Sequence, residues 1–284
     1  MFKKIFFAAA LLLASLLSAK PVVIASIAPV GYLAKAVGGD KIEVQSLAKG
    51  DVHSYEPKPN DMKAVAKARI FIAAGLEFEE AWIPRFKASA KNLVVVKSDA
   101  KIAKLKEERG EQAEHDEKHE AHADPHVWLN PMLAITMARN ISDALIDMDK
   151  ANKDFYLENF QKLMNDLLAF DESAKNELAG LKNRKFVVYH PAWGYFAAHY
   201  DLEQISIERS GKEPKIDEMA STLKMIKDEN IKVIFADPNR SQKSAQVLAS
   251  QTGAKVELLD PLGYNLLENL KIAVGAIKDA NSPK

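Results

Sequence analysis

The stretch Asn152–Leu178, with the sequence NKDFYLENFQKLMNDLLAFDESAKNEL, decides how the rest of the chain is interpreted. Its apolar residues recur at steps of three and four and would form one stripe on a helix; they are Tyr156, Phe160, Leu163, Leu167, Phe170 and Ala174. Gly180 follows and suits a helix end. About 27 residues at 1.5 Å each would span roughly 40 Å. That length predicts a spine helix, within residues 150–180, that joins two lobes; a plain surface helix is the alternative.

Strand-like and helical segments alternate on both sides of this helix. Continuous apolar runs of four to six residues suit parallel sheets that are covered on both faces. The expected strands are Val22–Ile27, Ile42–Leu47, Ile70–Ala74, Leu93–Val96, Phe186–Tyr189, Gln204–Ile207, Val233–Ala236 and Val256–Leu259. The sequence therefore predicts an α/β fold of two lobes, residues 20–149 and 181–284, each a mostly parallel four-stranded sheet flanked by helices.

Residues 1–19 have the pattern of a cleavable signal peptide. Lys3 and Lys4 precede the apolar run Ile5–Leu17, and Ser18 and Ala19 are small residues suited to cleavage. An uncleaved membrane anchor is the alternative, but the run is shorter than the roughly 20 apolar residues of a spanning helix. The chain has no cysteine, which excludes disulfides, thiolate metal sites and a lipid on an N-terminal cysteine. These features predict a soluble periplasmic protein.

The charge balance argues against a nucleic-acid partner. Lysine and arginine total 39, aspartate and glutamate total 39, and the formal net charge is zero. A nucleic-acid-binding domain usually carries a basic excess. Neither a phosphate-binding glycine loop nor a serine-nucleophile elbow occurs in the sequence. We therefore expect no nucleic-acid partner and no enzymatic activity.

Four segments each present a metal-binding side chain beside a turn-forming residue, and the side chains are His53, His126, His190 and Asp260. Two of them directly follow expected strands, and each is followed by a proline, which ends the strand. Ligands of open α/β sheets bind beyond the carboxyl ends of the strands. Three imidazoles and a carboxylate form a tetrahedral first shell for a divalent cation such as zinc. The fourth ligand stays open, since water, Glu56, Glu208 and Asp237 are rivals of Asp260.

Charges and histidines dominate residues 104–123, which we interpret as a solvated loop. His115, His119 and His122 would share a face if this segment were helical, and they are candidates for an auxiliary, low-affinity zinc-collecting site. An insert whose histidines have no role is the alternative. The segment does not fit a zinc-protease helix, because Asp116 stands where that motif requires glutamate.

These motifs resemble those of the receptors that serve zinc and manganese ABC importers, and the periplasmic zinc branch in particular. The shared segments are His53 with Tyr55 and Pro57, Asp124-Pro125-His126-Val127-Trp128-Leu129-Asn130-Pro131, Tyr189-His190-Pro191-Ala192-Trp193-Gly194-Tyr195-Phe196, Gly211-Lys212-Glu213-Pro214 and Leu259-Asp260-Pro261-Leu262-Gly263. The resemblance implies a metal between the lobes, with His53, His126 and His190 as ligands. The histidine-rich loop is a mark of the zinc branch.

The sequence departs from that branch in one informative place. Some members carry an acidic residue just before the first histidine, where this chain has Val52. This difference favours Asp260 or water as the fourth ligand.

The resemblance predicts a monomeric periplasmic receptor that captures Zn²⁺ and delivers it to an ABC permease in the inner membrane. A manganese or iron receptor of the same family is the first alternative, and three imidazoles favour zinc over manganese, which prefers oxygen ligands. A secreted zinc hydrolase is the alternative from another class, and it would need a general base that the sequence does not identify. A metal-dependent surface adhesin would need a surface anchor.

Overall fold

The computed structural model describes residues 20–106, 123–208 and 216–281. The predicted signal peptide, the three histidines His115, His119 and His122, and the segment Gly211-Lys212-Glu213-Pro214 lie outside the described residues. No described helix combines the length and the apolar content that a membrane span requires.

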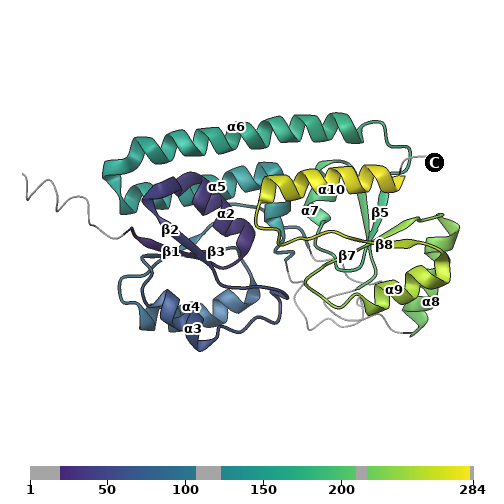
Figure 1. Cartoon of the computed structure of the whole chain (residues 1–284), viewed down its shortest axis with the longest axis horizontal. Helices are drawn as coiled ribbons and strands as arrows, with labels where there is room; N and C mark the ends of the chain where they lie inside the picture. Colours follow the sequence, from purple (N-terminus) through teal and green to yellow (C-terminus); the bar gives the residue numbers. More distant parts are fainter. Residues whose placement is uncertain (1–19, 107–122, 209–215, 282–284) are drawn as a thin grey trace, which may run out of the picture.

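Two four-stranded parallel sheets form the two lobes (Figure 1). The first sheet has the order β2-β1-β3-β4 and the second has the order β6-β5-β7-β8, so the two lobes repeat one topology. The strands are β1 Val22–Ala25, β2 Glu43–Ser46, β3 Ile70–Ala73, β4 Val94–Lys97, β5 Lys185–Val188, β6 Glu203–Ser206, β7 Val233–Ala236 and β8 Lys255–Leu258. The predicted fold class is confirmed.

The inner strands are buried on both faces, as their apolar sequences require. All four residues of β3 and all four of β7 are buried, whereas the outer strands β4 and β8 expose residues such as Val94 and Leu258. Each sheet reverses its strand order between its two inner strands, β1 and β3 in one lobe and β5 and β7 in the other. Ligands of open parallel sheets bind beyond the carboxyl ends of the strands at such a reversal.

The helices cover both faces of each sheet. Their bounds are α2 Ala28–Gly38, α3 Pro59–Val65, α4 Glu77–Ser89, α5 Pro131–Met148, α6 Lys153–Leu178, α7 Gly194–His199, α8 Ile216–Asp228, α9 Lys243–Thr252 and α10 Leu266–Asn281, with 3-10 turns at Gly39–Lys41, Val127–Leu129 and Lys150–Asn152. In Figure 1, α3 and α4 lie below the first sheet and α8 and α9 below the second, while α2, α5 and α10 lie between the sheets and α6.

The long helix α6 crosses both lobes. It packs against α2 and α5 of the first lobe and against α10 of the second (Figure 1). All six residues of the predicted apolar stripe are buried. One hydrophobic core extends from β1 and α2 through α6 to β5 and α10, and each lobe has a smaller second core. The lobes are therefore joined through a common core and not only by a linker.

Local signals explain where several helices begin and end. The Asn130 side chain accepts hydrogen bonds from the N–H groups of Met132 and Leu133, and Pro131 occupies the first turn of α5. Helix α9 ends at Gly253, which adopts a left-handed conformation with φ of 77°. Helix α9 begins after Gln242 without a side-chain cap. Helix α4 is rich in charge and has Pro84 in its interior, so its sequence gives only a weak helical signal.

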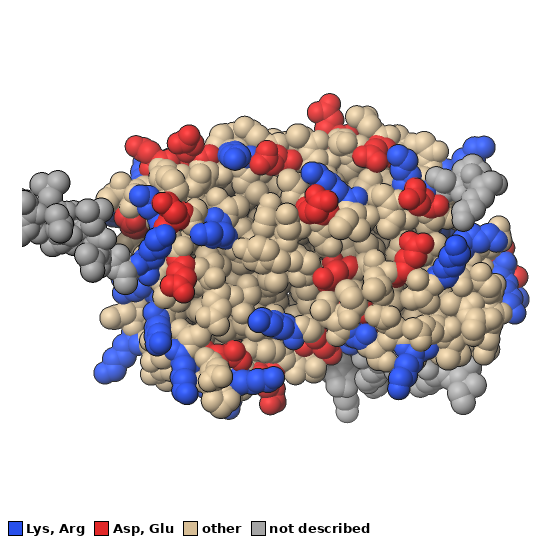
Figure 2. Space-filling model, in the orientation of Figure 1, with Lys and Arg blue, Asp and Glu red and all other residues tan. Residues whose placement is uncertain are grey.

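Both signs of charge are interspersed over the face shown in Figure 2. Lysine and arginine side chains alternate with aspartate and glutamate there, so no single-sign field covers this face. A mixed surface of this kind agrees with the zero net charge of the chain.

Candidate metal centre

His53 lies in the loop after β2, on a turn that its own sequence forms. The Asp51 carboxylate accepts the backbone N–H of His53 at 3.1 Å and the Ser54 hydroxyl at 3.0 Å. Aspartate commonly makes such a turn by accepting an N–H two residues on. Gly50, with φ of 85°, adopts the left-handed conformation that the preceding bend needs. The turn presents the His53 ring at the carboxyl edge of the first sheet.

His126 lies in the loop that leads into α5, and it is 4% exposed. One oxygen of Asp124, Oδ1, accepts the backbone N–H of His126 at 2.9 Å and contacts the ring Nδ1 at 2.8 Å. Next to it, Trp128 donates its indole N–H to the Pro261 carbonyl at 2.8 Å, which connects the first lobe to the loop after β8. Asp124 therefore fixes the orientation of the ring and leaves Nε2 available to bind a cation.

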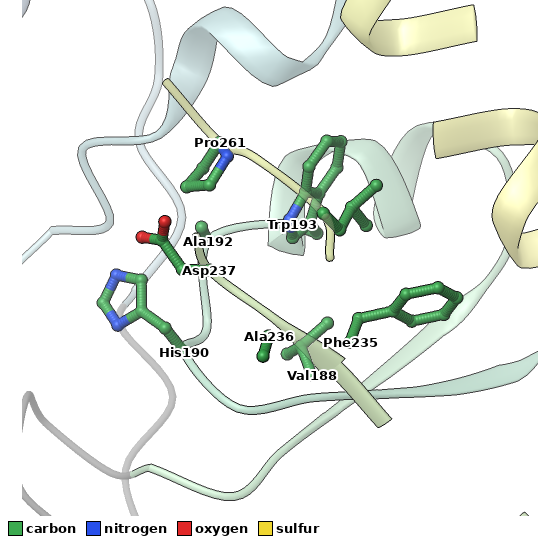
Figure 3. Close-up of a pocket in the computed structure, with 9 residues that line it drawn as sticks. Val188, His190, Ala192, Trp193, Phe235, Ala236, Asp237 and Pro261 are labelled. Atoms are coloured by element: carbon green, nitrogen blue, oxygen red, sulfur yellow. The ribbon is translucent and has the colours of Figure 1, made fainter. Parts of the chain in front are cut away.

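His190 follows β5 by two residues and is 7% exposed. Its Nδ1 lies 3.1 Å from Glu208 Oε2 and 2.5 Å from Arg240 Nη1. Glu208 lies beyond the end of β6 and Arg240 lies in the loop between β7 and α9, so three neighbouring connections meet here. Figure 3 shows His190 beside Asp237 and Pro261, at the edge of a pocket whose inner part holds Trp193 and Phe235.

The three imidazoles converge on one point. Each offers a ligand atom, and these atoms all lie within 4.8 Å of one another. His53 Nε2 and His190 Nε2 are 3.2 Å apart. Two nitrogens bound tetrahedrally to zinc at about 2.0–2.1 Å would be separated by about 3.3 Å. The observed spacing therefore fits a single small divalent cation without rearrangement of these two rings.

The site lies between the lobes. The small hollow at the three rings is lined by residues of both, namely Gly50, Asp51, Val52, His53, His126, His190, Asp237, Arg240, Pro261 and Leu262. His53 is the most exposed of the three histidines, and the other two are buried. A cation would therefore enter the site from the side of His53.

The surroundings favour neutral imidazoles. Partial burial, together with the neighbouring rings of His126 and His190, lowers the pKa of His53 to about 4. Burial, followed by the effects of His126 and Arg240, places the pKa of His190 well below its ordinary value. Metal binding requires deprotonated imidazoles. The site thus keeps these two rings uncharged at neutral pH, which metal binding requires.

Asp260 does not join the three histidines. Its Oδ1 accepts hydrogen bonds from the Asn239 side chain and from the Leu262 N–H, each at 2.8 Å. Asp237 lines the hollow, and burial raises the pKa of its carboxyl group. Glu208 lies behind His190, at Nδ1. The structure groups three of the four predicted ligands, and the fourth ligand stays a prediction.

Two side chains at the site were missed as participants by the sequence analysis. Asp124 has a recognisable signal, because an aspartate two residues before a histidine can accept both its N–H and its ring proton. Arg240 has no such signal, since its contacts with His190 and Glu208 connect residues 50 and 32 positions away. Only folding brings Arg240 to the site.

The chain matches the family described as zinc-uptake complex component A, periplasmic, over residues 23–280. The chain belongs to this family. That membership confirms the resemblance inferred from the motifs, and it places the chain among the components of transport systems.

Individual relatives agree with the family match. The high-affinity zinc uptake system protein ZnuA of Bacillus subtilis is 30% identical over 279 residues, which cover 91% of this chain and 86% of that protein. The zinc-binding lipoprotein AdcA of Streptococcus pneumoniae is 30% identical over 243 residues, which cover 82% of this chain and 48% of that protein. This chain therefore spans about half the length of AdcA.

The fold of the zinc-uptake family is also the fold observed here. A crystal structure of ZnuA superposes with a TM-score of 0.87 at 34% sequence identity. The match covers 93% of this chain and 100% of that one.

Proposed function

We propose that this protein is a periplasmic receptor that captures Zn²⁺ between its lobes and delivers it to an ABC permease in the inner membrane. One observation carries the proposal: His53, His126 and His190 offer ligand atoms that all lie within 4.8 Å of one another. Family membership supports the transport role. The ion is cargo, and the protein supplies no chemical step.

The donor set favours zinc over other divalent ions. Neutral imidazole nitrogens are preferred ligands of zinc, whereas manganese prefers carboxylates and other oxygens. The carboxylates of Asp124 and Glu208 lie at Nδ1 of two rings, where they orient the ligands. A manganese or iron receptor, the alternative within the family, would need more oxygen ligands than these.

The fourth position completes the tetrahedron. Asp260 is one candidate, because its bonds from Asn239 and Leu262 both end on Oδ1 and Oδ2 could serve as the donor once it comes within reach; water is the alternative. We also propose that the histidine-rich segment with His115, His119 and His122 collects zinc with low affinity. Removing these three imidazoles would then slow zinc capture at low zinc concentration while leaving the three-histidine centre intact.

A metal-bound crystal measured across the zinc and manganese absorption edges would test the function. We expect zinc density bonded to His53, His126 and His190, and we expect zinc to displace manganese from the purified protein. A His199→Gln variant serves as the matched control, because His199 pairs with Asp171 and lies outside the cluster. Preference for manganese, or density at another place, would contradict the proposal. Chelator-sensitive turnover of a substrate would support the hydrolase alternative instead.

A further inference from the structure

Two side chains of opposite charge share one nitrogen of His190. Glu208 Oε2 is 3.1 Å from Nδ1, Arg240 Nη1 is 2.5 Å from it, and Arg240 Nη1 and Glu208 Oε2 are 2.9 Å apart. The side chains of His190 and Glu208 are almost fully buried, with exposed fractions of 6% and 5%. Water therefore has little access to this triangle of polar groups.

Glu208 and Arg240 require different tautomers of the neutral His190 ring. An ionised carboxylate only accepts hydrogen bonds and a guanidinium only donates them. A bond to Glu208 needs the proton on Nδ1, which leaves a lone pair on Nε2. A bond from Arg240 needs a lone pair on Nδ1, which puts the proton on Nε2.

Nε2 is the nitrogen that faces the cluster, 3.2 Å from Nε2 of His53. In the form selected by Arg240, His190 donates its Nε2–H to His53, so the metal-free cluster is hydrogen-bonded but closed to a cation. In the form selected by Glu208, Nε2 can bind zinc. The change takes one proton from Nε2 to solvent and returns one to Nδ1, so the charge of His190 stays the same.

We propose that Arg240 is a positioning residue that sets the tautomer of His190 and thereby weakens zinc binding enough to permit release. The proposal rests on the proposed function of zinc capture. Asp51 offers Arg240 a second partner, since its Oδ2 is 3.6 Å from Arg240 Nη2. Asp51 also holds the turn that carries His53. A shift of Arg240 from His190 towards Asp51 would therefore connect the ligand loops of the two lobes.

The tautomer can be measured directly in metal-free protein labelled with ¹⁵N, by long-range ¹H–¹⁵N spectra of the imidazoles. The imidazole signals of His190 are assigned by their absence from the spectrum of His190→Gln. We expect the Nε2–H form in the wild type and in Arg240→Lys, which keeps a charged donor. We expect the Nδ1–H form in Arg240→Leu, and in Arg240→Met should the leucine variant fail to fold.

Zinc affinity provides the second measurement. Outer partners of metal ligands typically change affinity by about 10–100-fold, so Arg240→Leu should bind zinc about tenfold more tightly and release it more slowly. Arg139→Leu is the matched control, because it removes an exposed guanidinium that pairs with Asp143 on α5. We expect this control to bind as the wild type does, whereas Arg240→Lys should bind zinc more weakly than Arg240→Leu because it retains a charged donor.

The outcomes separate this proposal from the proposed function. A wild-type His190 in the Nδ1–H form without metal overturns it. So does tighter binding by Arg240→Leu with an unchanged tautomer, which would assign the effect to charge alone. Absence of zinc binding by the wild type would contradict the proposed function, whereas the tautomer spectra need no metal.

Discussion

His126 and His190 are two buried histidines of one cluster, and their supports are built differently. Each ring has a carboxylate at Nδ1, Asp124 for His126 and Glu208 for His190. Asp124 lies two residues from its histidine and Glu208 lies 18 residues from its own. Within the described part of the chain, only His190 also has an arginine at that nitrogen, Arg240.

This difference is the basis of the tautomer proposal: the contacts of Asp124 favour one tautomer of His126, whereas Glu208 and Arg240 favour different tautomers of His190. The Asp124 carboxylate accepts both the ring proton and the backbone N–H of His126, so that ring has one stable orientation and tautomer. A receptor that must also release its cargo needs at least one ligand that can be weakened. The predictions below test whether His190 is that ligand.

Loss of either buried ligand should have the largest effect. His126→Ala and His190→Ala each remove one of three imidazoles, and each should weaken zinc binding by more than about a hundredfold, beyond the range for outer partners. Titration calorimetry with a competing chelator measures this. Two ligand variants with near-wild-type affinity would show that the cluster is not the zinc site.

The supporting carboxylates should have the next largest effect. Asp124→Asn and Glu208→Gln keep shape but remove charge, and each should cost about 10–100-fold in zinc affinity. We expect the larger loss for Asp124→Asn, because Asp124 also holds the backbone of His126. Equal or reversed losses, measured in the same competition assay, would remove the distinction between the two supports.

Double-mutant cycles should show energetic coupling of Arg240 to Glu208 but not to Asp124. Glu208 and Arg240 contact each other and the same ring nitrogen, so their substitutions should couple by about 0.5–3 kcal/mol. The Asp124 and Arg240 substitutions act on different rings and should be additive within about 0.5 kcal/mol. Equilibrium zinc affinities of the single and double variants supply both values. Equal coupling in the two cycles would mean that Arg240 acts on the whole cluster by its charge.

Tyr195→Phe should modestly lower both the stability of the protein and its zinc affinity, because Tyr195 supports the segment that carries His126. The Tyr195 hydroxyl accepts the Leu105 N–H and donates to the Asp124 carbonyl, each at 2.8 Å. Loss of such bonds costs about 1–3 kcal/mol when the groups left behind are buried. We expect a lower free energy of unfolding in urea and a loss of zinc affinity smaller than that of Asp124→Asn. An unchanged unfolding midpoint would show that the hydrogen bonds of Tyr195 contribute nothing to the stability of the fold.

The smallest effect concerns protonation of His53. The pKa of His53 is about 4 in the folded, metal-free protein, so at about pH 4 this ring is charged in half of the molecules. Protonation of His53 should then lower the apparent zinc affinity about twofold at that pH. The unfolded chain takes up that proton near pH 6.5, its ordinary value, so folding stability should decrease as pH falls from about 6.5 towards 4.

An NMR titration of His53 gives the midpoint of its protonation. A peptide with the sequence Asp51–Pro57 gives the reference for an unburied ring. A midpoint near 6.5 in the folded protein would show that its neighbours do not affect it.

Much of the fold was predictable because it depends on short-range patterns. The buried runs such as Val233–Ala236 and the stripe on α6 indicated the strands and the spine helix, since apolar periodicity directly reflects which face is buried. Helix α4 was harder, because its sequence is rich in charge and contains Pro84.

The sequence by itself determined the two-lobed architecture, the spine and the three histidines, because strand runs, helix periodicity and ligand-plus-turn motifs are all local. Only the tertiary structure decided that Asp260 bonds to Asn239 and Leu262 apart from the histidines, and that Arg240 and Glu208 meet at His190. These contacts join loops from different strands, whose spacing depends on the order of strands in the sheet. A side chain's partners across such loops have no periodic signal in the sequence.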